Sequence, residues 1–219
     1  MAAHLGSKQT RRKPAEDRRR EILEVAAQLF RARGYSATSL DEVAETIGIT
    51  KAAIYYHFAS KDEVLFEMHD RIVRDALVRV RTIVESDDSP VEKMTRILTG
   101  HLQTLLANLD ANVVFHREVG FLPDERENEI RERERKHDLM IRRVYREGVG
   151  RGDFPDIDAA IAVNFLLGAC NMTYRWYRPS GTVSPGGTVR AILALLERGY
   201  LRSQSGSMVA SSTAASAAD

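Results

Sequence analysis

The fold of this chain is decided by residues 38–61, TSLDEVAETIGITKAAIYYHFASK. Ser39 and Glu42 have the spacing of a capping box, in which a serine hydroxyl and a glutamate carboxylate satisfy backbone amides at a helix start. Gly48 permits a tight turn, and Thr50 is placed to cap a second helix. Two short capped helices joined by a glycine turn predict a helix-turn-helix, the motif that sets its second helix in the major groove of DNA.

The second helix of this motif has an informative outer face. Ala53, Ile54 and Phe58 fall on the side that packs inward. The residues left to face outward or to the flanks are Lys51, Ala52, Tyr55, Tyr56 and His57. Hydroxyl and imidazole donors beside a lysine indicate contacts with DNA phosphates, with Lys61 adding charge from the next turn. The alternative is an aromatic patch between helices, which the caps and the flanking charges disfavour.

Residues 22–68 closely resemble the N-terminal domain of the TetR (tetracycline-repressor) family of bacterial regulators. The resemblance implies that Tyr56 and His57 contact phosphates, and that Lys51 and Tyr55 read bases or adjacent phosphates. It also implies that Thr38, before the first helix of the motif, faces DNA, and that Lys61 is the lysine that follows the motif. The predicted DNA-binding residues are therefore Thr38, Ser39, Lys51, Ala52, Tyr55, Tyr56, His57 and Lys61.

The charge of the chain is unevenly distributed. The formal net charge over 219 residues is only +1, but seven Lys or Arg and two acids lie between Lys8 and Arg20, beside the predicted DNA-binding helices. A solvated leader is the alternative interpretation of residues 1–10. We expect a disordered basic arm (residues 1–14), a helix-turn-helix domain (15–61), a ligand-binding and dimerisation domain (62–203) and a disordered tail (204–219).

The composition disfavours secreted and membrane proteins. Cys170 is the only cysteine, so the chain cannot form an intrachain disulfide, and nothing indicates an oxidising compartment. The N-terminus is too polar for a secretory signal. The longest apolar run, residues 159–170, is interrupted by Asn164 and is shorter than the ~20 residues of a membrane span. We expect a cytoplasmic protein with no membrane partner.

Helical periodicity runs through the rest of the chain, and no alternating strand pattern appears. We predict an all-α fold with helices over residues 15–33 and 62–84, the second of which links the DNA-binding end to the rest. Pro90 suits the first turn of the next helix, whose apolar residues continue to Leu109 and place it inside the second domain. Residues 123–147 carry pairs of opposite charge at i, i+4 spacing, which is typical of a solvated helix.

Two apolar segments near the C-terminus predict a dimer interface. Residues 156–178 leave almost no polar face, so this helix must be covered on two sides. A second helix over residues 185–201 carries one apolar stripe that includes Leu193 and Leu196. The TetR resemblance implies that these two helices form a four-helix bundle with their copies in a homodimer.

The string RWYRPSG at residues 175–181 resembles an element of TetR-type regulators of fatty-acid and sterol catabolism, which sense acyl-coenzyme A thioesters. Guanidinium groups bind phosphates and carboxylates in bidentate fashion, so an anionic head group is one interpretation. The other makes Trp176 a dimer-interface anchor and Arg178 an interface ion-pair partner. The predicted ligand-binding residues are Phe115, Phe121, Met140, Phe165, Arg175, Trp176 and Arg178.

No motif of an enzyme or a cofactor site is visible. His101, His116 and His137 lack metal-ligand spacing, although His116 is a candidate pocket residue. The glycines of residues 148–153 follow a helix and lack the third glycine of a nucleotide loop, so a helix end and a turn are expected. We expect no catalytic residue, no metal and no cofactor.

The expected function is that of a homodimeric repressor whose two motifs enter successive major grooves of a DNA operator. A small apolar or acyl-CoA effector would bind the second domain and release the protein from DNA. The alternatives are a small helical enzyme with an inconspicuous site and an architectural DNA-binding protein without a ligand. A large apolar cavity in the second domain would separate the repressor from the architectural protein.

Overall fold

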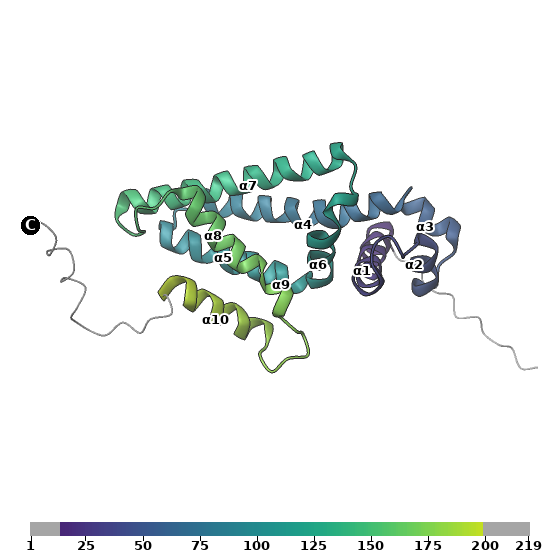
Figure 1. The fold of residues 1–219 in the computed structure, drawn as a ribbon. Coiled ribbons are helices and arrows are strands. Elements are labelled where there is room, and N and C mark those ends of the chain that lie inside the picture. Colours follow the sequence, from purple (N-terminus) through teal and green to yellow (C-terminus); the bar gives the residue numbers. More distant parts are fainter. Residues whose placement is uncertain (1–13, 199–219) are drawn as a thin grey trace, which may run out of the picture.

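The computed structural model describes residues 14–198 and shows an elongated chain of helices (Figure 1). These residues contain no strand, which confirms the predicted all-α fold. Nearly all of the predicted basic arm, the end of the last predicted helix and the predicted tail lie outside the described residues. The elements are α1 (Ala15–Arg33), α2 (Leu40–Ile47), α3 (Lys51–His57), α4 (Lys61–Val84), α5 (Pro90–Ala107), α6 (Leu109–Glu118), the 3₁₀ turn η1 (Val119–Phe121), α7 (Asp124–Arg151), α8 (Ala159–Asn171), α9 (Thr173–Trp176) and α10 (Pro185–Arg198).

The predicted caps of the helix-turn-helix are present. The Ser39 side chain accepts a hydrogen bond from the Glu42 amide, and the Ser39 amide donates to the Glu42 carboxylate at 2.7 Å, so the capping box is complete. The Thr50 side chain caps α3 by accepting from the Ala53 amide. Gly48 ends α2 with a left-handed φ of 77°. Because glycine takes this φ without steric cost, Gly48 allows α3 to leave α2 at a sharp angle.

One hydrophobic cluster joins the three N-terminal helices to the start of α4. Its fully buried side chains include Ile22, Phe30, Ile54, Phe58 and Val64. The same cluster extends to Val114 of α6, Leu122 of the following turn and Ile130 of α7. The domain boundary predicted between residues 61 and 62 therefore falls inside a helix and inside a single hydrophobic cluster.

Helices α4 and α7 pack side by side and form the spine of the second domain (Figure 1). Asp70 of α4 is buried and pairs with Arg133 of α7 at 2.8 Å and with Arg74 one turn along α4. Loss of one partner from a buried ion pair is strongly destabilising, so these charges favour one register of α4 against α7. The predicted i, i+4 ion pairs of α7 are also formed, namely Glu127–Arg131, Glu129–Arg133 and Glu132–Lys136.

Two predicted helices are interrupted in the structure. The helix that begins at Pro90 does not include Leu109, because Asn108 leaves the helical conformation and α6 begins after it. The apolar segment at residues 156–178 forms two helices, since α8 begins after the cap residue Asp158 and the short α9 follows Met172.

Helix α7 is longer than its charge pattern indicated. It continues through Gly148 and Gly150 and ends at Gly152, which has a left-handed φ of 77°. The expected helix end and turn are therefore confirmed, but only the last of the three glycines is the cap. Gly148 has a packing role, because a Cβ atom built there would lie 2.1 Å from the Phe154 ring.

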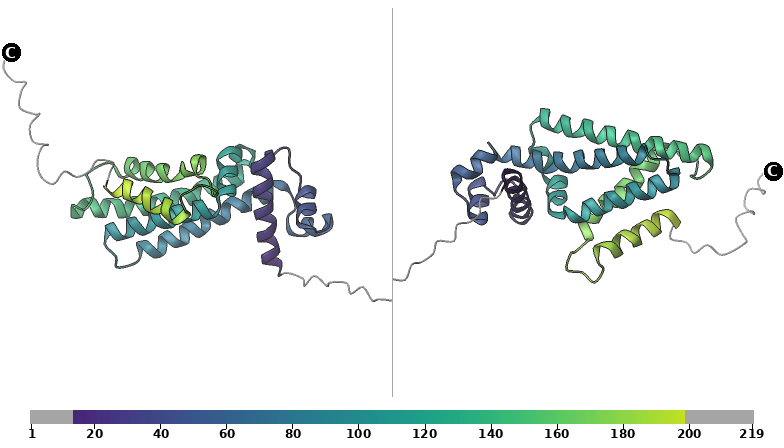
Figure 2. Two further views of the ribbon diagram at one scale, coloured as in Figure 1. Left: turned by 90° about the horizontal axis from the view of Figure 1, so that it is seen from below. Right: turned by 180° about the vertical axis from the view of Figure 1, so that it is seen from behind.

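The apolar side chains of α8 and α10 divide between an inner and an outer face. Leu193 and Leu196 are only partly buried and pack against this chain's own second hydrophobic cluster, so their contact with a second subunit stays a prediction. Figure 2 shows α10 lying along α5, as the contacts of the two helices require. The large apolar side chains that remain exposed on α8, α9 and α10 and at the junction of α8 and α9 are Ile161, Phe165, Met172, Trp176 and Leu195, and we call this set the outer apolar face.

Candidate DNA-reading surface and effector cavity

The predicted reading helix presents its tyrosines to solvent. Tyr56 is 81% exposed and Tyr55 is 44% exposed, whereas the preceding residue, Ile54, is fully buried. Lys51, at the N-terminus of α3, is exposed and forms an ion pair of 2.7 Å with Asp41 of α2. Ala52 and the cap residue Ser39 are exposed as well. The outward set predicted from the sequence therefore lies at the surface, with its polar groups available to a partner.

His57 is held at the C-terminal end of α3 by an arginine of α1. The Arg19 guanidinium donates to the His57 carbonyl, pairs with Glu67 of α4 and lies 4.2 Å from the centre of the Phe58 ring. Burial lowers the pKa of the His57 imidazole, and the charges of Arg19 and Arg18 lower it further. His57 is therefore a neutral imidazole at pH 7, suited to a single N–H hydrogen bond to a phosphate oxygen.

Two residues of the predicted DNA-binding set point inward. The Lys61 ammonium donates to the carbonyl oxygens of Tyr35 and Thr38, at 2.8 and 2.9 Å, and lies 4.3 Å from the Tyr35 ring centre. Thr38 is 2% exposed, and its hydroxyl donates to the Gly34 carbonyl. In this conformation both residues connect the α1–α2 turn to the start of α4, and their contact with DNA stays a prediction.

The second domain contains a cavity of about 380 Å³ between α4, α5, α6, α7 and α8. Its large apolar lining residues are Ile72, Val73, Val80, Ile83, Ile97, Leu105 and Leu167. Its polar lining residues are His69, Arg79, His101, Thr104, Asn112, His116, Glu134, His137, Asp138, Asn164 and Asn171. A volume in the range of small-molecule sites, with a few polar groups on a hydrophobic wall, is typical of a ligand cavity.

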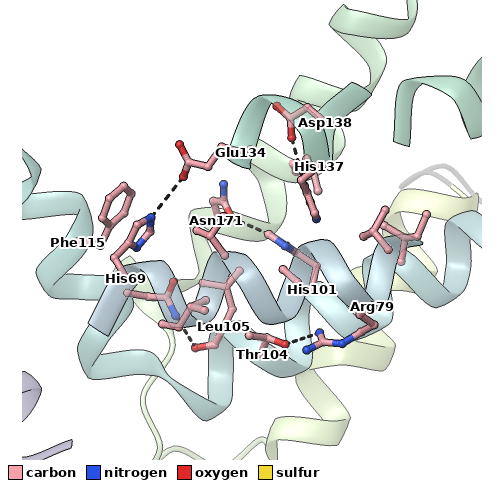
Figure 3. Close-up of a pocket in the computed structure, with 18 of the residues that line it drawn as sticks. His69, Arg79, His101, Thr104, Leu105, Phe115, Glu134, His137, Asp138 and Asn171 are labelled. Atoms are coloured by element: carbon pink, nitrogen blue, oxygen red, sulfur yellow. Dashed lines mark hydrogen bonds and ion pairs between the residues drawn. The ribbon is translucent and has the colours of Figure 1, made fainter. Parts of the chain in front are cut away.

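Most polar groups of the cavity already have partners (Figure 3). Nε2 of His101 lies 2.7 Å from Oδ1 of Asn171, and burial lowers the pKa of His101 to about 4. Arg79 donates to the Thr104 hydroxyl at 2.6 Å and to the Gly100 carbonyl at 2.9 Å. His101 is therefore neutral at pH 7, and Arg79 is the one Lys or Arg that lines the described cavity.

The residues predicted to bind a ligand are spread over several environments. Phe115 lines the cavity. Phe121 is exposed beside Tyr35, and Met140 packs against the second hydrophobic cluster. Phe165 and Trp176 belong to the outer apolar face. Arg175 and Arg178 line a separate hollow together with Val113, Tyr174 and two further arginines, Arg31 and Arg117; we call it the arginine hollow.

The cavity and the arginine hollow adjoin through a pair of stacked rings. His116 lines the cavity, Tyr174 lines the hollow, and their ring centres are 4.6 Å apart at an angle of 15°. Arg117, the next residue of α6, also lines the hollow. The stacked rings therefore form a partition between the cavity and the arginine hollow.

The sequence does not indicate that four histidines line one cavity. Only His116 was considered as a pocket residue, and His69 was not singled out. These residues come from α4, α5, α6 and α7, and no pattern within one segment indicates that they meet. Within residues 14–198 no cluster of three His, Cys, Asp or Glu residues could hold a metal ion, and no helix is long and apolar enough to cross a membrane.

Comparisons with known proteins agree with this division of the chain. Residues 22–68 match the family described as bacterial regulatory proteins of the tetR family, and residues 87–200 match the tetracyclin repressor-like C-terminal domain. The transcriptional repressor KstR2 of Rhodococcus jostii is 30% identical over 191 residues, which cover 84% of this chain and 94% of that protein.

Two solved structures extend the similarity to nearly the whole described chain. A TetR/AcrR-family regulator from Thermobifida fusca is 47% identical, with a TM-score of 0.68 over 85% of this chain and 100% of that one. The TetR-family regulator PfmR from Thermus thermophilus is 32% identical, with a TM-score of 0.75 over 83% of this chain and 99% of that one. With a helix-turn-helix at one end and a ligand-sized cavity at the other, this chain belongs to the TetR family of transcriptional regulators, which bind operator DNA and respond to effectors.

Proposed function

We propose that this protein is a homodimeric repressor that a small effector releases from its operator, and that the effector is an acyl-CoA thioester or a similar amphipathic molecule. The observation that carries this proposal is the position of the cavity on α4. The same helix contributes Val64, Leu65 and Met68 to the DNA-binding core and His69, Ile72 and Val73 to the cavity wall. A ligand that binds one orientation of α4 more tightly than the other shifts the equilibrium between DNA-binding states.

The cavity size limits which part of an effector is enclosed. At ~30 Å³ for each water-sized group, the 380 Å³ cavity holds roughly a dozen such groups. An acyl chain or small ring system fits, whereas the nucleotide of coenzyme A does not. The arginine hollow, which includes Arg175 and Arg178, supports the proposal because guanidinium groups favour phosphate and the hollow adjoins the cavity at the stacked rings of His116 and Tyr174.

The effector proposal predicts a dependence on acyl length. Acyl-CoA esters should release the operator-bound protein, with affinity rising by about 0.8 kcal/mol per buried methylene until the cavity is full, whereas free coenzyme A should act poorly. Fluorescence anisotropy of labelled operator, titrated with esters of increasing length, measures this. Arg175→Ala should weaken release by every ester, and Arg143→Ala, at an exposed arginine of α7, serves as the control.

Each arm of that experiment has a distinct negative result. No release by any ester would exclude acyl-CoA as the effector and leave a different apolar ligand. Release that is unaffected by Arg175→Ala would keep the effector class and remove the arginine hollow as its head-group site.

The DNA-reading role of α3 is tested by two single-residue substitutions. Tyr56→Phe or His57→Ala should weaken operator binding by about 1 kcal/mol per half-site, because each removes one hydrogen bond to phosphate. Operator affinity measured by anisotropy checks this, with sedimentation to show that the dimer persists. Tyr174→Phe, which removes a tyrosine hydroxyl in the second domain, should leave DNA affinity unchanged. Full affinity in both α3 variants would contradict the assignment.

The proposal also bears on where the protein acts and on whether it is an enzyme or an architectural protein. We propose that the protein acts in the cytoplasm and catalyses no reaction, since its relatives are transcriptional regulators. The ligand-sized cavity argues against an architectural DNA-binding protein, which would have no use for one.

A further inference from the structure

His69 is placed in the cavity without a good hydrogen bond to either ring nitrogen. It is 6% exposed, Nδ1 has no hydrogen-bond partner among the described residues, and Nε2 has only one long polar contact. The ring stacks on Phe115 with a centroid distance of 3.3 Å and an angle of 4°, so its orientation is fixed. An unpaired polar group in such a position is costly, and native proteins rarely keep one without a reason.

The nearest polar group to His69 belongs to α7. Nε2 of His69 lies 3.4 Å from Oε1 of Glu134, which is longer than a good N–H···O hydrogen bond. Figure 3 shows His69, Phe115 and Glu134 grouped at one end of the cavity, with Arg79 at the other. Burial lowers the pKa of His69, and the Glu134 carboxylate opposes this shift only in part. At pH 7 the imidazole is neutral and offers one donor and one acceptor.

A hydroxyl group complements this pair better than other simple groups. It can donate its proton to the Glu134 carboxylate and accept a hydrogen bond from the His69 ring, and both partners lie close enough together for one oxygen to reach them. A ketone can only accept, and a carboxylate would be repelled by Glu134. A saturated hydrocarbon would leave His69 unpaired and exclude water from it.

We propose that His69 and Glu134 form a specificity site for a hydroxyl group carried on the apolar part of the effector. The inference rests on the proposed effector role of the cavity, and it narrows the ligand class to hydroxylated acyl or alicyclic groups. The cavity then discriminates between an oxidised metabolite and its hydrocarbon parent.

The test compares two probe pairs that differ by one hydroxyl. The thioester pair is 3-(4-hydroxycyclohexyl)propanoyl-CoA and 3-cyclohexylpropanoyl-CoA, measured by operator release. The coenzyme-free pair is 4-propylcyclohexanol and propylcyclohexane, measured by calorimetric or thermal-shift binding to the full-length protein without DNA. The wild type should bind each hydroxylated probe about tenfold more tightly than its parent, equivalent to about 1.4 kcal/mol.

Three variants assign the preference to the proposed pair. His69→Phe keeps the stacking on Phe115 but removes both ring nitrogens, so the preference should disappear. His69→Gln restores a donor and an acceptor and should recover part of it. His137→Phe makes the same replacement at another cavity histidine, whose Nδ1 already lies 3.3 Å from Asp138, and should keep the preference. Circular dichroism melts establish that each variant is folded.

The outcomes separate this inference from the effector proposal. If the thioesters fail to release DNA but the alcohol preference is present and depends on His69, the acyl-CoA proposal fails and the hydroxyl site stands. If the wild type binds no hydroxylated probe better than its parent, or if His69→Phe retains the preference, the hydroxyl site is wrong.

Discussion

Replacing Phe165 by Asp is expected to convert the homodimer into monomers and to lower affinity for a full operator by a hundredfold or more. Phe165 is 69% exposed in the isolated chain, and Ile161, one turn earlier, is 65% exposed on the same helix. Large apolar side chains repeated at i, i+4 on an outer face indicate a surface covered by another subunit. An unpaired aspartate buried there costs several kcal/mol, enough to separate the subunits at micromolar concentration.

Sedimentation velocity and operator titration measure the two effects of Phe165→Asp separately. Val78→Asp is the matched control, because Val78 is 61% exposed on α4 and lies outside the outer apolar face. The control should sediment as a dimer. A dimeric Phe165→Asp protein with full operator affinity would show that the subunits associate through another surface.

Replacing either of two glycines of α7 by alanine is expected to change the free energy of unfolding, in opposite directions at the two positions. A Cβ at Gly148 would lie 2.1 and 2.4 Å from two atoms of the Phe154 ring, which stacks on Tyr145. Gly148→Ala must displace that ring and should lower the free energy of unfolding by about 1–3 kcal/mol. Nothing lies within 4 Å of a Cβ at Gly150, so Gly150→Ala should raise it by about 0.5–1 kcal/mol through better helix propensity.

Urea unfolding of the two variants and the wild type measures both changes, provided that the m-values agree. Each variant is the control for the other, since both add one methyl group to the same helix. A stabilised Gly148→Ala protein would mean that Phe154 can move away at little cost. A destabilised Gly150→Ala protein would mean that the exposed side of α7 at this point is covered in the dimer.

The DNA-binding end could be predicted in detail because its signals are local. The capping box of Ser39 and Glu42, the Gly48 turn and the Thr50 cap each depend on residues within a few positions, and all are present. The inward orientation of Lys61 could not be predicted in this way. Its ammonium is bound by carbonyl oxygens on a turn more than twenty positions earlier, which only the folded chain brings near.

The cavity was predicted as a feature but not as a set of residues. Phe115 lines the cavity, whereas Phe165, which the sequence also predicts as a ligand contact, lies on the outer apolar face. Apolarity shows that a side chain needs cover and does not show whether this chain or a second copy provides it. The same limit applies to Leu193, which is partly buried against this chain and whose remaining surface a second copy can still cover.

The passage of α4 through both hydrophobic clusters affects how the protein denatures. Its first turns carry Val64 and Leu65 of one cluster, and its last turns carry Val80 and Ile83 of the other. Unfolding of α4 would expose core side chains of both hydrophobic clusters. The DNA-binding end and the second domain should therefore unfold in a single transition. A ligand bound in the cavity would then slow hydrogen exchange in α1 and α2, which it does not touch.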